Sequence, residues 1–193
     1  MRELRIHGRG GQGAVIASKL LAAALFKEGK HVQSFPAFGV ERRGAPVTAF
    51  LRLSDGPILL RCEIDRPDDL IVLDPTLVEA VNVAAGLKPG GRILINSPRS
   101  PEEYSVLDRR FRVATVDANA IAREHGLGSK AQPIVNTAIL GAFAAVSGLV
   151  ALDAVCEAIA EEVPIMPHEN EAAAREAAEA VRTSSRIPEA EHA

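Results

Sequence analysis

The sequence predicts an α/β fold: a Rossmann-like, three-layer domain with a mostly parallel sheet, a β-hairpin insertion and a helical C-terminal part. Three observations indicate this fold. A glycine-rich segment at residues 8–13 joins a strand-like apolar run to a run with helical spacing. Short apolar or β-branched runs then alternate with helix-like segments, as in α/β proteins. From residue 135 onward the apolar residues follow helical spacing.

The first unit of the chain predicts a strand, a helix and a second strand. Residues 3–8 (ELRIHG) read as a short buried strand that ends at the glycines. Residues 14–28 carry apolar side chains at helical spacing, and Gly29 ends the helix. Residues 31–35 (HVQSF) form the second strand. This order is typical of a βαβ unit in a parallel sheet.

The middle of the chain predicts a hairpin followed by alternating strands and helices. The runs 47–53 and 58–64 are separated by the turn signal SDGP, so we expect them to pair with each other. Continuous apolar strands and short helices follow them. Strands are expected within 69–75, 88–97 and 111–118, and helices over 76–85 and 119–126.

The C-terminal part predicts three helices. They are expected over 135–147, 152–162 and 169–182. The length fits one domain, residues 1–183, and the last residues, 184–193, are expected to be a flexible tail.

Composition excludes several classes of function. Hydrophobic residues make up 47% and charged residues 24% of the chain, as is ordinary for a globular protein. Aromatic residues are 4% and tryptophan is absent, which argues against a stacking platform for single-stranded nucleic acid. The net charge of −3 does not favour nucleic acid or an anionic membrane as a partner.

Cysteine usage and the apolar segments bear on location. Cys62 and Cys156 are too few and too far apart in sequence to hold a zinc ion or an iron–sulfur cluster alone. They do not form a disulfide framework, so a reducing cytoplasm is expected. The start of the chain lacks the pattern of a signal peptide. The apolar stretch 135–152 contains polar residues and favours a buried helix over a membrane span.

The glycine-rich segment is the first candidate binding site. Glycines between a strand and a helix allow a tight turn and a close approach of backbone N–H groups to an anion at the helix N-terminus. A dinucleotide site would require an acidic residue about 20 positions later, where the chain has Gln33 and Ser34. The glycines could instead only allow the helix to pack closely. The candidate residues are Gly8, Arg9, Gly10, Gly11, Gln12 and Gly13.

A second candidate lies in the loop after the second strand. In an open α/β sheet the carboxyl ends of the strands carry the ligand crevice. Adjacent arginines can clamp a phosphate or carboxylate through bidentate hydrogen bonds. A solvated charged turn is the alternative. The residues of interest in this loop are Glu41, Arg42, Arg43 and Gly44.

Two polar residues open the apolar helix expected over 135–147. Asn136 and Thr137 follow Pro133 by a few residues. Both a capping role and a role in a site or an interface fit them, because Asn and Thr side chains accept hydrogen bonds from the first N–H groups of helices.

The motifs together resemble a known family. GRGGQGAV, FPAFGVERRGAPV, VNTAILGAF and an asparagine opening the last helix, Asn170, occur in order over nearly the whole chain. This combination resembles the gamma subunit, or gamma domain, of the 2-oxoacid:ferredoxin oxidoreductases, the pyruvate:ferredoxin oxidoreductase family. The form FGVERRGAP is similar to that of the pyruvate and branched-chain 2-oxoacid types.

The resemblance implies an activity and a division of labour. The family cleaves a 2-oxoacid oxidatively with coenzyme A to acyl-CoA, CO2 and two electrons, which pass through iron–sulfur clusters to ferredoxin or another acceptor. Thiamine diphosphate, magnesium and 4Fe–4S clusters are implied on alpha, beta and ferredoxin-like delta partner subunits. The gamma subunit is implied to have no catalytic residue or metal of its own, to close the active site and to help bind coenzyme A.

Two alternatives remain beside this interpretation. One is a stand-alone NAD(P)-binding oxidoreductase, against which the missing acid after the second strand argues. The other is a purely structural assembly subunit whose glycine loop only contacts partners.

Overall fold

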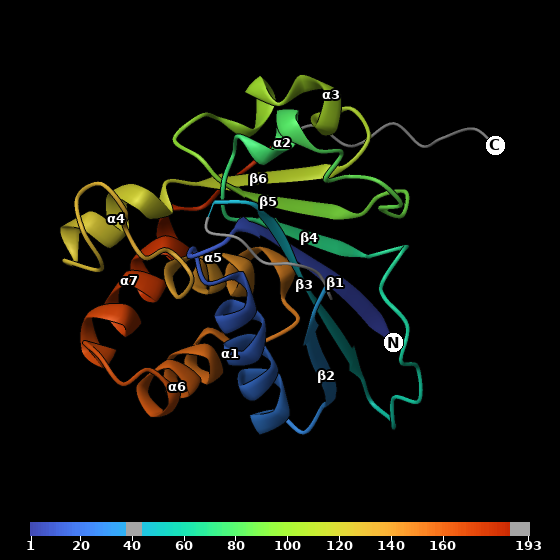
Figure 1. Cartoon of the computed structure of the whole chain (residues 1–193), viewed down its shortest axis with the longest axis horizontal. Coiled ribbons are helices and arrows are strands. Elements are labelled where there is room, and N and C mark those ends of the chain that lie inside the picture. Colours follow the sequence, from blue (N-terminus) through green and yellow to red (C-terminus); the bar gives the residue numbers. More distant parts are fainter. Residues whose placement is uncertain (38–43, 186–193) are drawn as a thin grey trace.

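The computed structural model describes residues 1–37 and 44–185, whose elements follow the expected alternation of strands and helices (Figure 1). The strands are β1 (Arg2–Arg9), β2 (His31–Pro36), β3 (Pro46–Ser54), β4 (Asp69–Val72), β5 (Arg92–Asn96), β6 (Arg112–Val116) and β7 (Arg182–Thr183). The helices are α1 (Ala14–Lys27), α2 (Leu77–Ala80), α3 (Ser105–Asp108), α4 (Ala118–Glu124), α5 (Ala138–Ser147), α6 (Leu152–Glu162) and α7 (Pro167–Ala180), with a 3-10 turn η1 (Pro101–Glu103).

The described strands form one mixed sheet in the order β2-β3-β1-β4-β5-β6-β7. The neighbours β1, β4, β5 and β6 are parallel. β3 is antiparallel to both β1 and β2, and β7 is antiparallel to β6. β1, β2, β4, β5 and β6 therefore run in one direction, which confirms the α/β class.

The expected βαβ unit is wrong in one respect. β1, α1 and β2 occur as predicted, and β1 and β2 point the same way. They are not neighbours, however, because β3 lies between them and pairs with both. The position of β3 between β1 and β2 depends on pairing between segments that are distant in sequence. The local hydrophobic patterns of the sequence carry no information about such pairing.

The expected hairpin of 47–53 with 58–64 is also wrong. β3 forms its hairpin with β2, in register from His31 opposite Ser54 to Pro36 opposite Ala49. Since β1 holds the other edge of β3, no edge remains for the segment 57–64, which we call the strap. The strap instead crosses the outside of the sheet without regular structure.

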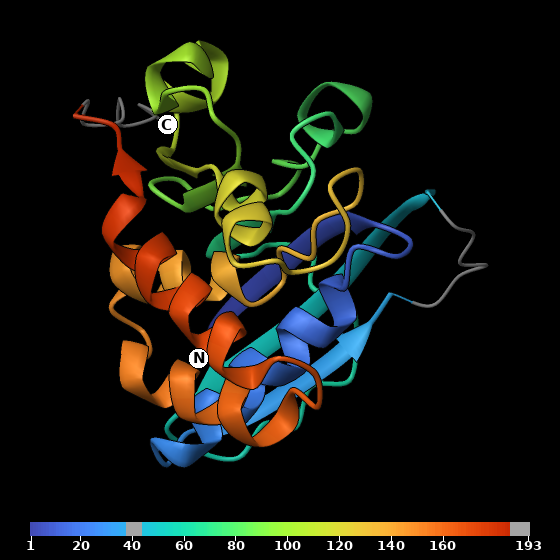
Figure 2. The same cartoon turned by 90° about the vertical axis from the view of Figure 1, so that its left-hand side faces the viewer.

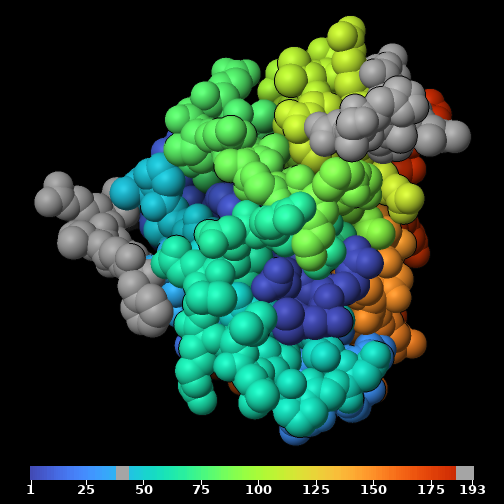
Figure 3. All heavy atoms as spheres, turned by 90° about the vertical axis from the view of Figure 1, so that its right-hand side faces the viewer, coloured from blue at the N-terminus to red at the C-terminus, as the bar shows by residue number. Residues whose placement is uncertain are grey.

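A buried arginine holds the strap. Arg52 is 1% exposed. Its guanidinium donates to Glu3 Oε1 at 2.9 Å, to Gln33 Oε1 at 3.0 Å and to the carbonyl of Glu63 at 3.3 Å. These bonds join β1, β2 and the strap to β3. Figure 3 shows the teal segment 55–68 at the surface around the blue N-terminal residues.

Two hydrophobic clusters lie on opposite faces of the sheet (Figure 1). Successive strand residues alternate between them, as the strand period of two requires. In β4, Ile71 faces the cluster with α1, α5, α6 and α7, whereas Leu70 and Val72 face the cluster that includes Leu77 and Tyr104. The result is the predicted three-layer arrangement.

The C-terminal helices agree with the sequence patterns, and α6 has the predicted bounds. The helix expected over 76–85 is wrong in length, since α2 ends at Ala80 and Val81 is extended. Arg5 donates to the carbonyls of Val83 and Ala85, which the chain presents only by leaving the helix. Within the described residues, no helix combines the length and apolar character needed to cross a bilayer.

Close packing of α5 on α7 completes the layer on the first face. A Cβ atom at Gly141 would overlap the carbonyl oxygen of Ala174. The two helices therefore approach through the bare backbone of Gly141 and the small side chains of Ala173, Ala174 and Ala177, each 0% exposed.

Candidate functional site

A cleft of about 650 Å³ opens at the carboxyl ends of the parallel strands. Figure 2 looks onto this edge, where the blue loop after β1, the green loop after β4 and the loop between α4 and α5 meet. The connections of β1 and β4 cover opposite faces of the sheet, so the cleft lies where ligands bind in open α/β sheets. One wall carries residues 9–12 and Gly44, the floor Leu73, Asp74 and Pro75, and the other wall Asn119, Arg123, Gly128, Ser129 and residues 131–135.

The glycine loop turns in the way that its sequence predicts. Gly11 has φ of 98° and Gly13 has φ of 79°, both in the left-handed region that favours glycine. Gly13 is the N-cap of the 14-residue helix α1 and makes no side-chain cap. A Cβ atom at Gly13 would lie 2.7 Å from Nδ2 of Asn136, so glycine is also required for close packing.

Only part of the expected backbone donor set is available. The N–H of Gly10 donates to the carbonyl of Ala45 at 2.9 Å, and that of Gln12 donates to the carbonyl of Arg9 at 2.9 Å. The N–H groups of Gly11 and Gly13 have no acceptor among the described residues. Of the four N–H groups from Gly10 to Gly13, two are therefore used within the described part of the protein, and those of Gly11 and Gly13 are not.

The glycine loop is hydrogen-bonded to Gly44, the last candidate residue of the predicted loop 41–44, which we call the arginine loop. The N–H of Gly44 donates to the carbonyl of Gly10 at 3.1 Å, and Arg9 Nη1 donates to the carbonyl of Gly44 at 3.1 Å. Gly44 thus lines the cleft as predicted. Glu41, Arg42 and Arg43 lie outside the described residues.

Asp74 is the centre of a polar network at the floor of the cleft. Its Oδ2 accepts from Arg9 Nε at 3.0 Å and from Gln12 Nε2 at 3.1 Å. Its Oδ1 accepts from the N–H of Thr76 at 3.0 Å and from Thr76 Oγ1 at 2.6 Å. Arg9 Nη2 also donates to Thr76 Oγ1 at 2.7 Å. The glycine loop is thereby fixed to the loop after β4.

The same network keeps Asp74 ionised. Burial favours the neutral carboxylic acid, but hydrogen bonds from Thr76 and Gln12 and the charge of Arg9 outweigh it and lower the pKa of Asp74. Arg9 is therefore paired with Asp74, and each of its three guanidinium nitrogens donates one hydrogen bond to a protein oxygen. Arg9 and Gln12, predicted as binding residues, do line the cleft, where they also hold its floor in place.

The far wall of the cleft is formed by α4 and the loop after it. Asn119 and Arg123 are four residues apart and so lie on one face of α4. The loop is closed by a bond from the N–H of Ile134 to the carbonyl of Leu127 at 3.0 Å and by a bridge between Gly128 and Pro133. Backbone contacts therefore hold this wall in place, as they hold the glycine loop on the other side of the cleft.

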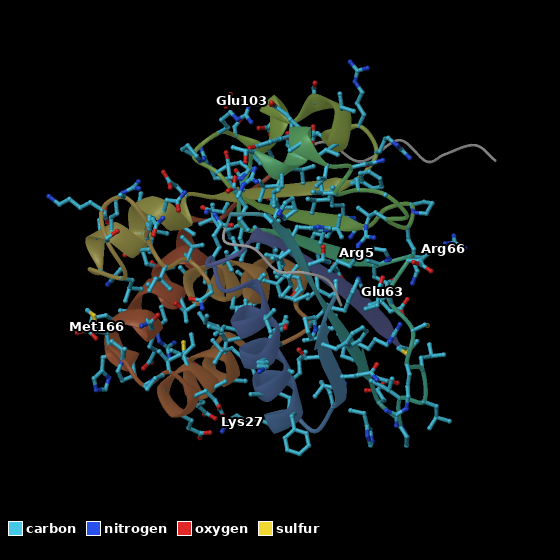
Figure 4. All side chains as sticks on the ribbon, in the orientation of Figure 1. Arg5, Lys27, Glu63, Arg66, Glu103 and Met166 are labelled. Atoms are coloured by element: carbon cyan, nitrogen blue, oxygen red, sulfur yellow. The ribbon has the colours of Figure 1, made fainter. Side chains whose placement is uncertain are left out.

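Asn136 and Thr137 occupy different surroundings. Thr137 makes no side-chain cap on α5 and donates instead to Oδ1 of Asn170 at 2.7 Å, so it ties α5 to α7. Asn170 also donates to the carbonyls of Ile165 and Met166, which fixes the left-handed turn at Met166. Figure 4 shows Met166 at the periphery of the molecule. Asn136, 6% exposed, packs on Gly13, and its Oδ1 has no hydrogen-bond partner among residues 1–37 and 44–185. The capping interpretation is wrong for the Thr137 side chain.

Two cleft residues had a usable signal in the sequence. Asp74 follows the buried strand 69–72, and Asn119 follows the buried strand 112–116. Polar residues directly after parallel strands meet at one edge of the sheet, which would have indicated both. No comparable signal marks Arg123 or residues 128–132, because only the fold brings them to the cleft.

The sheet order also bears on the NAD(P) alternative. In a dinucleotide fold the end of the second strand adjoins the glycine loop and supplies the ribose contact. Here β3 separates β2 from β1. Ser34 of β2 bonds to Ser18 of α1, and Gln33 bonds to Arg52 and to the strap. The geometry does not support that alternative.

Comparisons with known proteins agree with one another. A family model described as pyruvate ferredoxin/flavodoxin oxidoreductase matches residues 3–180. The pyruvate/ketoisovalerate oxidoreductases common subunit gamma of Thermococcus kodakarensis is 55% identical over 163 residues, 83% of this chain and 86% of that protein. The pyruvate synthase subunit PorC of Methanocaldococcus jannaschii is 52% identical over 159 residues, 82% of this chain and 84% of that protein.

A solved structure extends the likeness to the fold. The crystal structure of the pyruvate oxidoreductase subunit PORC from Thermotoga maritima superposes with a TM-score of 0.79 at 33% identity. The superposition covers 95% of this chain and 98% of the other.

Proposed function

The chain belongs to the pyruvate ferredoxin/flavodoxin oxidoreductase family, and from this membership we propose that it is the gamma subunit of a 2-oxoacid oxidoreductase complex. The complex converts a 2-oxoacid and coenzyme A to acyl-CoA and CO2 and passes two electrons to ferredoxin or another acceptor. The observation that carries this proposal is the 55% identity to a common gamma subunit over 83% of the chain.

Within the complex, the role proposed for this chain is to close the active site and to bind part of coenzyme A. The cleft supports this role by its position and chemistry. It has a volume of about 650 Å³, its lining residues 9–12 directly precede the N-cap of α1, and the N–H of the lining residue Gly11 has no acceptor among the described residues. Such a donor suits a diphosphate. Glu41, Arg42 and Arg43 are proposed to add charged contacts beside Gly44.

The redox and carbanion chemistry belongs to partner subunits in this proposal. Thiamine diphosphate, magnesium and 4Fe–4S clusters are assigned to alpha, beta and ferredoxin-like delta subunits. Cys62 is exposed and Cys156 is buried on α6, so the two thiols of this chain do not converge on one site.

The proposal is tested by anaerobic purification of the tagged chain from its own cells. Co-elution of larger subunits with 2-oxoacid-dependent and CoA-dependent reduction of a viologen dye is expected, and the best 2-oxoacid identifies the substrate. A lone chain without this activity would overturn the proposal.

The role of the arginine loop needs a separate variant. Changing both Arg42 and Arg43 to Ala in the complex is expected to raise the KM for CoA. Arg109→Ala, an exposed arginine outside the cleft, is the matched control. Unchanged KM and turnover in the double variant would remove the ligand role and support a purely structural subunit.

A further inference from the structure

We propose that Arg123 is the anion-binding residue of the cleft and contacts a phosphate group of coenzyme A. This inference rests on the proposed function, which it deepens by naming a residue outside both sequence motifs. Arg123 lies on the far wall of the cleft, opposite the glycine loop.

The charges of the described cleft single out Arg123. The charged residues that line it are Arg9, Asp74 and Arg123. Arg9 and Asp74 form an ion pair with Nε and Oδ2 3.0 Å apart, and every nitrogen of the Arg9 guanidinium donates to a protein oxygen. Arg123 has no hydrogen bond or ion pair within the described part of the chain. Among the described residues that line the cleft, Arg123 is therefore the positively charged side chain without a protein partner.

The surroundings of Arg123 fix the position of its backbone at the cleft. Arg123 projects from the last turn of α4, whose Ile121 and Ala122 are 5% and 0% exposed and anchor the helix in the core. Asn119, one turn earlier on the same helix, offers an amide to the same ligand. Across the cleft, the lining residue Gly11 has an N–H without an acceptor among the described residues, and the N-terminus of α1 that follows this loop favours negative charge.

Two positive features on facing walls match a ligand with more than one phosphate. Coenzyme A carries a diphosphate and a 3′-phosphate, and a guanidinium binds a phosphate through two parallel hydrogen bonds. Either group can be the contact of Arg123. The shared chemistry is a phosphate dianion or diphosphate that reaches from the glycine loop to α4.

Arg123→Gln in the assembled complex tests the inference. The KM for CoA is expected to rise about tenfold or more, the loss of one charge-assisted contact, with little change in kcat or in the KM for the 2-oxoacid. Arg123→Lys keeps the charge and should recover part of the affinity. Arg109→Gln changes the net charge equally outside the cleft and should leave the KM unchanged.

Assays with 3′-dephospho-CoA identify the phosphate. If Arg123 contacts the 3′-phosphate, wild type and Arg123→Gln have equal KM values for this analogue. If it contacts the diphosphate, the variant remains weaker with both ligands. Equal KM values for CoA itself, in a variant whose thermal stability matches wild type, would overturn the inference. A wild-type complex whose turnover needs no CoA would overturn the proposed function instead.

Discussion

Asp74 shows how a single carboxylate positions the glycine loop. Four hydrogen bonds from Arg9, Gln12 and Thr76 converge on it, and it links the end of β1 to the loop after β4. The site therefore depends on a residue that does not need to touch a ligand.

Asp74→Asn should weaken this link. The amide keeps the size of the side chain but loses the ion pair with Arg9. Its NH2 group must also face either the donors of Arg9 and Gln12 or those of Thr76, so hydrogen bonds on that side are lost. We expect the free energy of unfolding to fall by about 2 kcal/mol and the KM for CoA to rise. Asp153→Asn breaks an exposed pair with Arg175 and should lower the free energy of unfolding much less. Urea denaturation of both variants measures the difference, and equal losses would contradict the role of Asp74.

His7 makes the stability of the protein depend on pH. Burial, with a smaller effect of the Arg5 charge, lowers the pKa of His7 from 6.5 to about 4. Between these values the unfolded chain binds a proton that the folded chain does not. The contribution of neutral His7 to the free energy of unfolding is therefore fully present above pH 6.5. This contribution, about 3 kcal/mol in total, is lost as the pH falls toward 4.

His7→Gln isolates this effect. The difference in unfolding free energy between wild type and variant should change across pH 6.5 to 4, because only the wild type has the buried imidazole. His31→Gln, at an exposed position of β2, is the control and should not change the profile. A difference that stays constant from pH 7 to pH 4 would show that His7 is not the cause.

At the scale of elements, the α5–α7 contact depends on one glycine. Gly141→Ala places a Cβ on the carbonyl oxygen of Ala174, which is backbone and cannot move aside cheaply. We expect a loss of about 3 kcal/mol from overpacking. Gly56→Ala adds the same methyl group in open space and should be nearly neutral. The two melting temperatures provide the measurement, and a stable Gly141→Ala protein would mean that the helices can separate.

The sequence predicts elements better than it predicts their neighbours. Helical spacing and stop signals are local, so α1 and α6 have nearly their expected bounds. The hairpin was predicted wrongly because β3 could have paired with β1, with β2 or with the strap, and all three carry apolar side chains. β1 and β2 occupy both edges of β3, and the buried Arg52 binds the strap only through the carbonyl of Glu63 and the thiol of Cys62. An arginine in an apolar run gives no hint of such contacts.

The same contrast between local patterns and long-range contacts explains which site residues could be predicted. Gly11 and Gly13 were predicted because left-handed backbone is a property of glycine itself. Arg123 was missed because its importance depends on α4 lying opposite the glycine loop and on Arg9 being neutralised elsewhere. For Thr137 the sequence left capping and a site or interface role open, and its hydroxyl bonds to Asn170, 33 positions later.

At the scale of the whole molecule, the two hydrophobic clusters share one sheet and should unfold together. Tyr104, the single tyrosine, is 6% exposed and lies in the cluster with α2, whereas most helical residues belong to the other face. Tyrosine fluorescence and far-UV circular dichroism therefore report opposite faces. We expect their urea transitions to coincide, as in a two-state protein. Separate midpoints would show that the faces are independent.

Residues 38–43, which connect β2 to β3, form a segment that can be replaced as a unit. The N–H of Ala37 donates to the carbonyl of Thr48 at 2.8 Å, and the N–H of Gly44 donates to that of Gly10 at 3.1 Å. Both ends are thus held by groups outside residues 38–43, so a sequence of another kind or length can be grafted between them without shifting the sheet.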